Sequence, residues 1–299
     1  MLNQLLSSPL DGSLNNLYLR IHQEAGISFF PLLGIRSASK VRFGGKRVVW
    51  EGRAAGVDYT ATFAVTDRGV WFWDVKTRGE GVNIDLIYGQ DVGDADPGAV
   101  RSNEAYLSQY IDHTVFDDGD KGYVVCSRQN QPQGGAFPYM QQGSLTRAAG
   151  YSTDGFQFFG QSYKETNVPE SLTRGQLANE VYQYEFAYTA LQSELVALSG
   201  EERFVFYGLY RADHPAAIAE LEFAVDVQNA WEAYVAEEAG ELRELPPVSL
   251  KPSIGEPLQT LDLTEGEVSE LFPARYQEER KDGKLLAFFT ETYEHIVLK

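Results

Sequence analysis

Apolar and polar residues alternate with a period of two along much of the chain. In residues 57–65 every second side chain is apolar, and a Thr-Asp-Arg-Gly sequence then leads into the apolar run 70–75. Because successive side chains of a strand point to opposite faces of a sheet, this pattern predicts a hairpin with a glycine-containing turn. A second hairpin is predicted over residues 40–50, with its turn at Gly44 and Gly45. Further strands are predicted at 82–88, 122–127, 151–159, 181–198, 284–290 and 295–299.

The longest predicted strand, 181–198, carries Tyr182, Tyr184, Phe186 and Tyr188 on one face. Such a face must pack against another layer or line a concave surface. Strands of this length suit a large curved sandwich. The expected fold class is therefore mainly β, a large antiparallel sandwich with few short helices.

Helical patterns are sparse. One helix is predicted to begin near Pro215 and to extend to about Tyr234, with an approximate apolar stripe. The stretch 240–255 is rich in Glu, Pro and Gly and is typical of a connector. Residues 264–267 resemble a capping box before a short helix that Pro273 ends.

The charge balance narrows the range of partners. The chain has 299 residues, of which 43 are acidic and 25 basic, so its formal net charge is −18. A negative field repels phosphate backbones and anionic lipid headgroups, and we therefore expect neither nucleic acid nor a membrane as partner. A simpler reason for the acidic excess is that it keeps an aromatic-rich β protein in solution.

Several features indicate a cytoplasmic protein. Cys126 is the only cysteine, so no internal disulfide can form and a reducing compartment is tolerated. The N-terminal segment has no basic flank and is broken by Pro9 and Asp11, unlike a signal sequence. No run approaches the length that spans a membrane. The last residues, from His295 to Lys299, form an apolar run, and we expect polypeptide to continue beyond it.

Three polar, glycine-punctuated segments lie among the predicted strands, at 89–98, 101–113 and 126–135. The segment 101–113 contains two Tyr, a His and an Arg without helix-like apolar spacing, as if built to present side chains. Amide, guanidinium, carboxylate and aromatic groups together suit a neutral polyhydroxylated ligand. Its hydroxyls need donors and acceptors, and its C–H faces need flat apolar partners. The pattern indicates sugar chemistry.

Other chemistries fit the same residues less well. Residues 91–98 resemble a calcium loop, but Pro97 interrupts it and no Glu closes it, which favours an acidic turn. The four histidines are scattered, with no pair at metal-binding spacing. Cys126 lies in an apolar run, where a buried inert thiol is commoner than a nucleophile. Trp71 and Trp73 could stack on sugar rings, but core packing is the safer interpretation.

Two acidic positions have open alternatives. Asp154 lies in a Ser-Thr-Asp-Gly sequence that is typical of a hairpin turn, where it either caps the turn or binds a hydroxyl. Asp112 and His113, near Asp117 and Asp118, are enough to imagine an acid and base pair. Without a spatial constraint that pair is weak.

Seven stretches carry a resemblance to a known family: residues 30–35, 71–75, 87–91, 101–113, 127–131, 150–160 and 283–289. Through them the chain resembles the N-terminal part of 1,2-β-oligoglucan phosphorylases. These enzymes belong to glycoside hydrolase family 94, formerly glycosyltransferase family 36, with cellobiose phosphorylase and the phosphorylase-like region of cyclic β-1,2-glucan synthases. The resemblance covers nearly the whole chain, and its most specific match is the segment 101–113.

The resemblance implies cleavage of a β-1,2-glucosidic bond by inorganic phosphate, with release of α-glucose 1-phosphate and inversion. In the family a carboxylic acid protonates the leaving oxygen while phosphate attacks the opposite face of the anomeric carbon. Phosphate is a co-substrate, and no metal or organic cofactor is expected. The family places the acid and the phosphate site on an (α/α)6 barrel that follows a β-supersandwich, so no autonomous catalysis is expected from these 299 residues.

The expected domains are an N-terminal β-supersandwich over 1–262 and, over 263–299, its end and the start of a linker towards the barrel. The expected partners are a β-linked glucooligosaccharide, the chain's own C-terminal barrel and a second subunit of a homodimer. In the family the N-terminal domain can lend loops to the substrate cleft. The residues predicted to contact substrate here are Arg101, Asn103, Tyr106, His113, Arg128, Gln129, Asn130 and Asp154.

Three alternatives remain open. The predicted site residues can instead hydrogen-bond neighbouring loops to one another, because buried polar groups need hydrogen-bond partners close by. The chain can act as a stand-alone carbohydrate-binding module through the aromatic face of 182–188. It can also serve as a purely structural or dimerisation domain, which predicts a large apolar patch and no sugar affinity.

Overall fold

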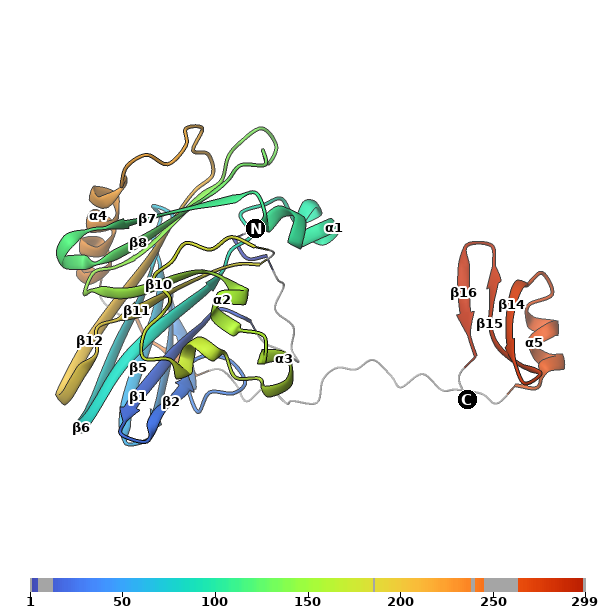
Figure 1. Cartoon of the computed structure of the whole chain (residues 1–299), viewed down its shortest axis with the longest axis horizontal. Coiled ribbons are helices and arrows are strands. Elements are labelled where there is room, and N and C mark those ends of the chain that lie inside the picture. The colour runs from blue at the N-terminus through green and yellow to red at the C-terminus, as the bar shows by residue number, and fades with distance from the viewer. Residues whose placement is uncertain (1, 5–12, 185, 238–239, 245–262, 298–299) are drawn as a thin grey trace. The chain divides into compact units, whose positions relative to one another are not determined.

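The computed structural model describes residues 2–4, 13–184, 186–237, 240–244 and 263–297 (Figure 1). Contacts divide the chain into two units, Met1–Val248 and Ser249–Lys299. The domain boundary expected at residue 262 lies at the end of a stretch outside the described residues. Within the described ranges no helix is long and apolar enough to cross a membrane.

The first unit is built on an antiparallel sheet of 13 strands, which confirms the mainly β fold class. Its main path runs β13-β3-β4-β5-β6-β12-β9-β8-β7, and β1, β2, β10 and β11 branch from it (Figure 1). The strands are β1 (Asn16–Gln23), β2 (Gly26–Pro31), β3 (Lys40–Gly44), β4 (Arg47–Ala54), β5 (Val57–Val65), β6 (Val70–Asp91), β7 (Ile111–Asp117), β8 (Tyr123–Gln129), β9 (Tyr139–Ser144), β10 (Ala148–Asp154), β11 (Ala187–Ser193), β12 (Val196–Arg211) and β13 (Arg243–Glu244).

Strand β6 organises the sheet because it is 22 residues long and changes partners along its length. Its first part pairs with β5 and β12, and its second part pairs with β1 and β11. Between these parts Gly81 has a φ of 71°, and the register of β12 shifts between Leu198 and Ser199. Glycine adopts a positive φ at little cost, and a register shift bends a strand. The sheet therefore bends at this point without a break in β6.

Apolar side chains from the sheet fill the core of the first unit. Trp71 and Trp73 belong to its largest buried cluster, which confirms that they are core residues. The indole of Trp71 is satisfied there, because its Nε1 donates to the hydroxyl of Tyr88 at 3.1 Å. Cys126 is fully buried in a second cluster, and burial raises the pKa of its thiol to about 12. The thiol is therefore protonated and inert at neutral pH.

Short helices lie in the connections between the strands of the sheet. They are α1 (Pro97–Ser108), α2 (Gly155–Phe159), α3 (Tyr163–Thr166) and α4 (Ala224–Ala236), together with the 3-10 turns Gly119–Lys121 and Glu170–Thr173. Helix α4 buries Val227, Ala230 and Tyr234 against the sheet. Its Trp231 ring meets Phe72 of β6 edge-on, with ring centroids 5.1 Å apart. The outer face of the sheet is thus covered at one end by α4.

The second unit contains α5 (Glu265–Leu271) and a sheet of β14 (Tyr276–Lys281), β15 (Lys284–Thr290) and β16 (Tyr293–Ile296). The predicted capping box is confirmed: Thr264 Oγ1 accepts from the backbone of Glu267, whose carboxylate accepts from the backbone of Thr264. Phe272 packs on Phe288, with ring centroids 5.2 Å apart.

The prediction of a single strand over 181–198 is wrong. Residues 181–184 lie outside the strands, so Tyr182 and Tyr184 share no strand face with Tyr188. Side chains from β10 take the place of a strand ladder here. The backbone N–H of Tyr182 donates to Thr153 Oγ1 at 2.8 Å, and that of Tyr184 donates to an Asp154 carboxylate oxygen at 3.0 Å.

The strand predicted at 151–159 ends early, and the hairpin turn at Asp154 is wrong. The Asp154 carboxylate accepts from the backbone of Phe156 at 2.7 Å and from that of Gln157 at 3.4 Å. These contacts cap the N-terminus of α2. An Asp followed by Gly fits a helix cap as well as a turn, and here the cap forms.

Two helix predictions also need correction. The helix expected from Pro215 begins at Ala224. Residues 213–223 form no helix or strand, Arg128 binds the carbonyls of His214 and Pro215, and Phe223 adopts a left-handed φ of 62° immediately before α4. The segment 101–113 is helical as far as Ser108, although it lacks a regular apolar stripe. Asn103 breaks the helical geometry in its middle, with φ −166° and ψ 87°.

Candidate functional site

The β7–β8 hairpin holds four of the residues predicted to contact substrate, and it uses them internally. Arg128 is buried and donates to the carbonyl oxygens of His214 at 2.7 Å and Pro215 at 2.9 Å. It also bonds the Asn130 side chain, which in turn donates to Asp112. The Arg128 guanidinium therefore fixes the segment that leads to α4 and has little capacity left for a ligand.

Gln129 and His113 are likewise committed to internal contacts. Gln129 is fully buried, donates to the carbonyl of Leu107 in α1 at 3.3 Å and accepts from the backbone of Gln131 at 2.9 Å. His113 Nδ1 lies 2.9 Å from Ser127 Oγ. Burial lowers the pKa of His113 to about 4, so its imidazole is neutral at pH 7. The acid and base pair imagined for Asp112 and His113 gains no support from this geometry.

Helix α1 carries the three predicted residues that face solvent, Arg101, Asn103 and Tyr106. Asn103 Oδ1 accepts from the backbone of Tyr106 at 3.0 Å, which starts a second helical segment after the kink. The hydroxyls of Tyr106 and Tyr110 lie 3.0 Å apart, and the two ring centroids are 4.9 Å apart. A direct role of these three side chains in binding sugar stays a prediction.

Asp154 is almost fully buried, at 1% exposed, and acts through two neighbours. One carboxylate oxygen caps α2 and the other accepts from the backbone of Tyr184. The pKa of this carboxyl is raised, because the effect of burial exceeds that of the backbone hydrogen bonds, which lower the pKa. The side chain itself does not reach solvent, but it fixes Phe156 and Tyr184 beside each other.

Those two rings border a pocket of about 670 Å³, which we call the aromatic groove. Phe156 is 48% exposed and Tyr184 51%, with ring centroids 6.0 Å apart. Phe159 and Phe186 stack deeper in the groove at 6.1 Å and 17°. The groove is lined by Leu14, Gly155, Phe156, Phe159, Gly160, Gln161, Tyr163, Lys164, Tyr184 and Phe186. It offers exposed ring faces beside amide and ammonium donors.

The aromatic groove adjoins a second pocket of about 400 Å³, and the two share Leu14, Phe159 and Tyr163 in their linings. The second pocket adds polar groups from Asn16 and Arg36. The two linings together present flat apolar and hydrogen-bonding groups. Such a surface matches the chemistry of a sugar chain.

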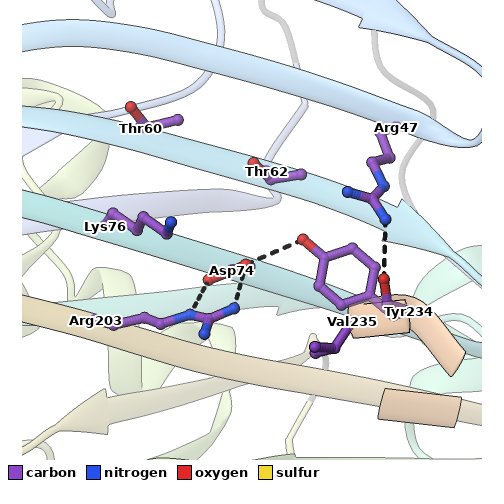
Figure 2. Close-up of a pocket in the computed structure, with 8 residues that line it drawn as sticks. All are labelled: Arg47, Thr60, Thr62, Asp74, Lys76, Arg203, Tyr234 and Val235. Atoms are coloured by element: carbon purple, nitrogen blue, oxygen red, sulfur yellow. Dashed lines mark hydrogen bonds and ion pairs between the residues drawn. The ribbon is translucent and has the colours of Figure 1, made fainter. Parts of the chain in front are cut away.

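A different pocket, of about 400 Å³, lies on the outer face of the sheet beside α4, and we call it the basic pocket (Figure 2). Its lining comes from β4, β5, β6, β12 and α4: Arg47, Thr60, Thr62, Asp74, Lys76, Arg203, Tyr234 and Val235. Asp74 lies between Arg203 and Tyr234, as Figure 2 shows, and the Arg47 guanidinium lies over the Tyr234 ring at 4.5 Å. Three cationic side chains thus surround one carboxylate.

Sequence reasoning missed both pockets. Phe156, Phe159 and Tyr163 fell in or beside a predicted strand, so their clustering on two short helices was hidden. The alternation of β5 and β6 does place Thr60, Thr62, Asp74 and Lys76 on the polar face, but it does not say which strand brings Arg203 beside them. Within the described residues no group of three or more His, Cys, Asp or Glu side chains could hold a metal ion.

The comparisons agree with the resemblance seen in the sequence. Residues 1–208 match the family model described as the SOGP N-terminal domain, and residues 272–299 match the glycoside phosphorylase supersandwich domain. The chain is 39% identical, over its whole length, to a Listeria innocua protein named 1,2-beta-oligoglucan phosphorylase. It spans 26% of the length of that relative. The family models give the term supersandwich to 272–299, whereas the expectation gave it to 1–262. The chain belongs to the family of the SOGP N-terminal domain.

Proposed function

We propose that this chain is the N-terminal, non-catalytic part of a glycoside phosphorylase that reversibly converts β-1,2-glucooligosaccharides and inorganic phosphate to α-glucose 1-phosphate with inversion. The observation that carries the proposal is 39% identity across the whole chain to a protein named 1,2-beta-oligoglucan phosphorylase. Identity of this extent over the whole length of the given chain supports a shared architecture. The chain amounts to 26% of that relative, which leaves room for a separate catalytic domain.

In this proposal the chemistry occurs on a C-terminal (α/α)6 barrel of a cytoplasmic homodimer. A carboxylic acid protonates the leaving oxygen, and phosphate attacks where an inverting hydrolase would use water. Phosphate is then the co-substrate, and the reaction needs no metal or organic cofactor. The present chain supports the barrel and the dimer and supplies one edge of the substrate cleft.

The aromatic groove is the surface that best fits the cleft edge. Phe156 and Tyr184 expose about half of their surface, at 48% and 51%, although large apolar side chains are usually buried. The Asp154 carboxylate accepts hydrogen bonds from the backbone of both residues, so the groove is preorganised. Flat rings beside Gln161 and Lys164 can stack on the C–H face of a glucosyl unit and bond its hydroxyls. Asp154 therefore enters the proposal as a positioning residue, whereas the sequence predicted a direct contact.

The test is a phosphorolysis assay on the full-length gene product and its Phe156→Ala and Tyr184→Ala variants. We expect each variant to raise KM for a β-1,2-glucooligosaccharide by about tenfold, which corresponds to about 1.4 kcal/mol of lost stacking, while kcat changes less than about twofold. Phe43→Ala is the matched control, because Phe43 is 42% exposed on β3 and does not line the groove.

Unchanged KM in both groove variants would contradict the cleft-edge role. If the variants also lowered the melting temperature of the full-length protein but not that of the isolated chain, the groove would be a packing face for another domain. Measurable affinity of the isolated chain for the oligosaccharide, lost in Tyr184→Ala, would instead favour a carbohydrate-binding module that works alone.

A further inference from the structure

The basic pocket has an unusual balance of hydrogen-bonding atoms. Its lining holds one carboxylate among the described residues, that of Asp74. This carboxylate accepts from Arg203 Nε at 2.7 Å, from Arg203 Nη2 at 2.8 Å and from the Tyr234 hydroxyl at 3.0 Å (Figure 2). The Asp74 side chain is only 8% exposed. Its charge is neutralised by Arg203, and its oxygens are already occupied. Asp74 is therefore a poor acceptor for a ligand hydroxyl.

The remaining polar atoms of the pocket are mainly donors. Lys76 is exposed, and its ammonium has no hydrogen-bond partner among the described residues. Arg47 uses Nη2 for the carbonyls of Tyr234 at 2.9 Å and Glu237 at 2.8 Å. Its Nε and Nη1, like Nη1 of Arg203, make no hydrogen bond within the described part of the chain. The lining therefore offers several charged donors and, apart from two threonine hydroxyls, few acceptors.

This donor excess selects against a neutral sugar and favours an oxyanion. Each sugar hydroxyl donates as well as accepts, whereas a phosphate group mainly accepts and carries the opposite charge to the pocket. Arginine forks and a lysine ammonium are the side chains that proteins use most for phosphate. A pocket of about 400 Å³ is also of the size that holds small molecules.

The surrounding charge makes this cluster distinctive. The chain as a whole has a formal charge of −18, so its general field repels anions. Lys76 also borders a neighbouring pocket lined by Asp58 and Glu201, and Asp58 lies 3.5 Å from Arg53. Among the residues that the structure describes, Asp74 is the one carboxylate that lines the basic pocket.

We propose that the basic pocket binds a phosphate-type oxyanion, either free inorganic phosphate or the phosphoryl group of a hexose phosphate. Lys76, Arg47 and Arg203 would donate to the anion, and Thr60 and Thr62 would complete the site from β5. Tyr234, which binds Asp74 and lies under Arg47, holds two of the three cations in position. The site goes beyond the proposed phosphorolysis and does not depend on it, because binding at this pocket requires no catalytic domain.

Titration calorimetry of the 299-residue chain at constant ionic strength tests this proposal with three ligands: inorganic phosphate, α-glucose 1-phosphate and glucose. We expect the two phosphates to bind and glucose not to bind. Tighter binding of glucose 1-phosphate than of phosphate would identify a sugar phosphate as the preferred source of the anion, and equal or weaker binding would identify free phosphate.

Lys76→Glu is expected to weaken phosphate binding by at least about tenfold, because it replaces a charge-assisted donor by a like charge. Lys76 is exposed, so the variant should fold. Lys40→Glu, at an exposed position of β3 outside the pocket, is the matched control and should bind phosphate like the wild type. Absence of phosphate binding by the wild type, or equal weakening in both variants, would overturn the site. Either result would leave the phosphorolysis assay unaffected, so the two proposals fail separately.

Discussion

Replacing Arg20 with Met is expected to lower the free energy of unfolding of the first unit by about 3–5 kcal/mol. Arg20 of β1 lies directly opposite Asp85 of β6, and both side chains are fully buried. Arg20 Nε donates to Asp85 Oδ1 at 2.7 Å, and Nη2 donates to Oδ2. A third nitrogen, Nη1, donates to the carbonyl of Arg174. Without the guanidinium, the polar neighbours left to Asp85 among the described residues are Gln192 and His22, and its charge is no longer compensated.

Urea unfolding followed by tryptophan fluorescence measures this effect, because Trp50, Trp71, Trp73 and Trp231 all lie in the first unit. Arg53→Met is the control. Arg53 is 67% exposed and lies 3.5 Å from Asp58, so its loss should cost less than about 1 kcal/mol. Equal effects of the two substitutions would contradict the buried ion pair.

A double variant separates the cost of leaving the Asp85 charge uncompensated from the cost of losing the packing of Arg20. Arg20→Met with Asp85→Leu removes both charges and leaves no uncompensated carboxylate. We expect it to recover a large part of the stability lost in the single variant, because an apolar pair of similar volume often replaces a buried ion pair without loss. A double variant that is less stable than Arg20→Met alone would show that Asp85 stabilises the fold through its other contacts.

Replacing Asp94 with Asn is expected to make the fold less sensitive to rising pH. Asp94 is 1% exposed and adopts a φ of 42°, and its carboxylate oxygens have no hydrogen-bond partner among the described residues. Burial, and then the nearby charge of Asp91, raise its pKa to about 8. In the unfolded chain an Asp has a pKa of about 3.9. Between these values the folded state binds more protons than the unfolded state.

The sign of the effect follows from this difference. Stability associated with Asp94 is complete below about pH 4, falls as the pH rises and levels off above about pH 8, with a total on the order of 5 kcal/mol. Asn has no proton to lose, and it tolerates the left-handed backbone that Asp94 adopts. Asp94→Asn should therefore be more stable than the wild type at pH 8.5, with a much smaller difference at pH 5.

Urea unfolding at half-unit intervals between pH 5 and pH 9 measures this dependence. Asp58→Asn is the control at an exposed carboxylate and should follow the wild-type curve. If the free energy of unfolding of Asp94→Asn changes with pH as steeply as that of the wild type, Asp94 is not the buried carboxyl that titrates. If Asp58→Asn flattens the curve equally, surface charge is the cause.

Much of the sheet could be predicted because its rules are local. The alternation in 57–65 and the glycine turns at 44–45 and 66–69 specify hairpins between neighbouring strands, and β3-β4 and β5-β6 form as expected. The capping box at Thr264 is equally local. The family also followed from the sequence, since a long polar segment such as 101–113 is specific even though its helical structure was not predicted.

The failed predictions share a physical cause, which is that distant side chains replaced the local pattern. Residues 181–184 have the composition of a strand, but Thr153 and Asp154 of β10 hold their backbone. Residues after Pro215 have a helical pattern, but Arg128 of β8 binds the carbonyls of His214 and Pro215, and the helix begins only at Ala224. A single sequence does not show such pairings before the fold is known.

The ligand chemistry of the candidate site could be predicted from the sequence better than the residues that form it. The sequence indicated sugar chemistry and named Asp154, which accepts hydrogen bonds from the backbone of Phe156 and Tyr184, two residues of the aromatic groove. Seven of the eight predicted residues, however, make internal side-chain hydrogen bonds: Asn103, Tyr106, His113, Arg128, Gln129, Asn130 and Asp154. Polar side chains in loops serve the fold as often as a ligand. In the basic pocket Asp74 and Arg203 are 129 residues apart, so only the strand order brings them together.

The most direct test of the central claim is phosphorolysis by the full-length gene product. The protein is mixed with a β-1,2-glucooligosaccharide and inorganic phosphate, and proton NMR follows the anomeric signal of the first product formed. We predict α-glucose 1-phosphate, formed by the full-length protein and not by the 299-residue chain alone. Release of free glucose without phosphate incorporation, or no turnover of any β-1,2-linked glucan, would contradict the assignment to a glycoside phosphorylase.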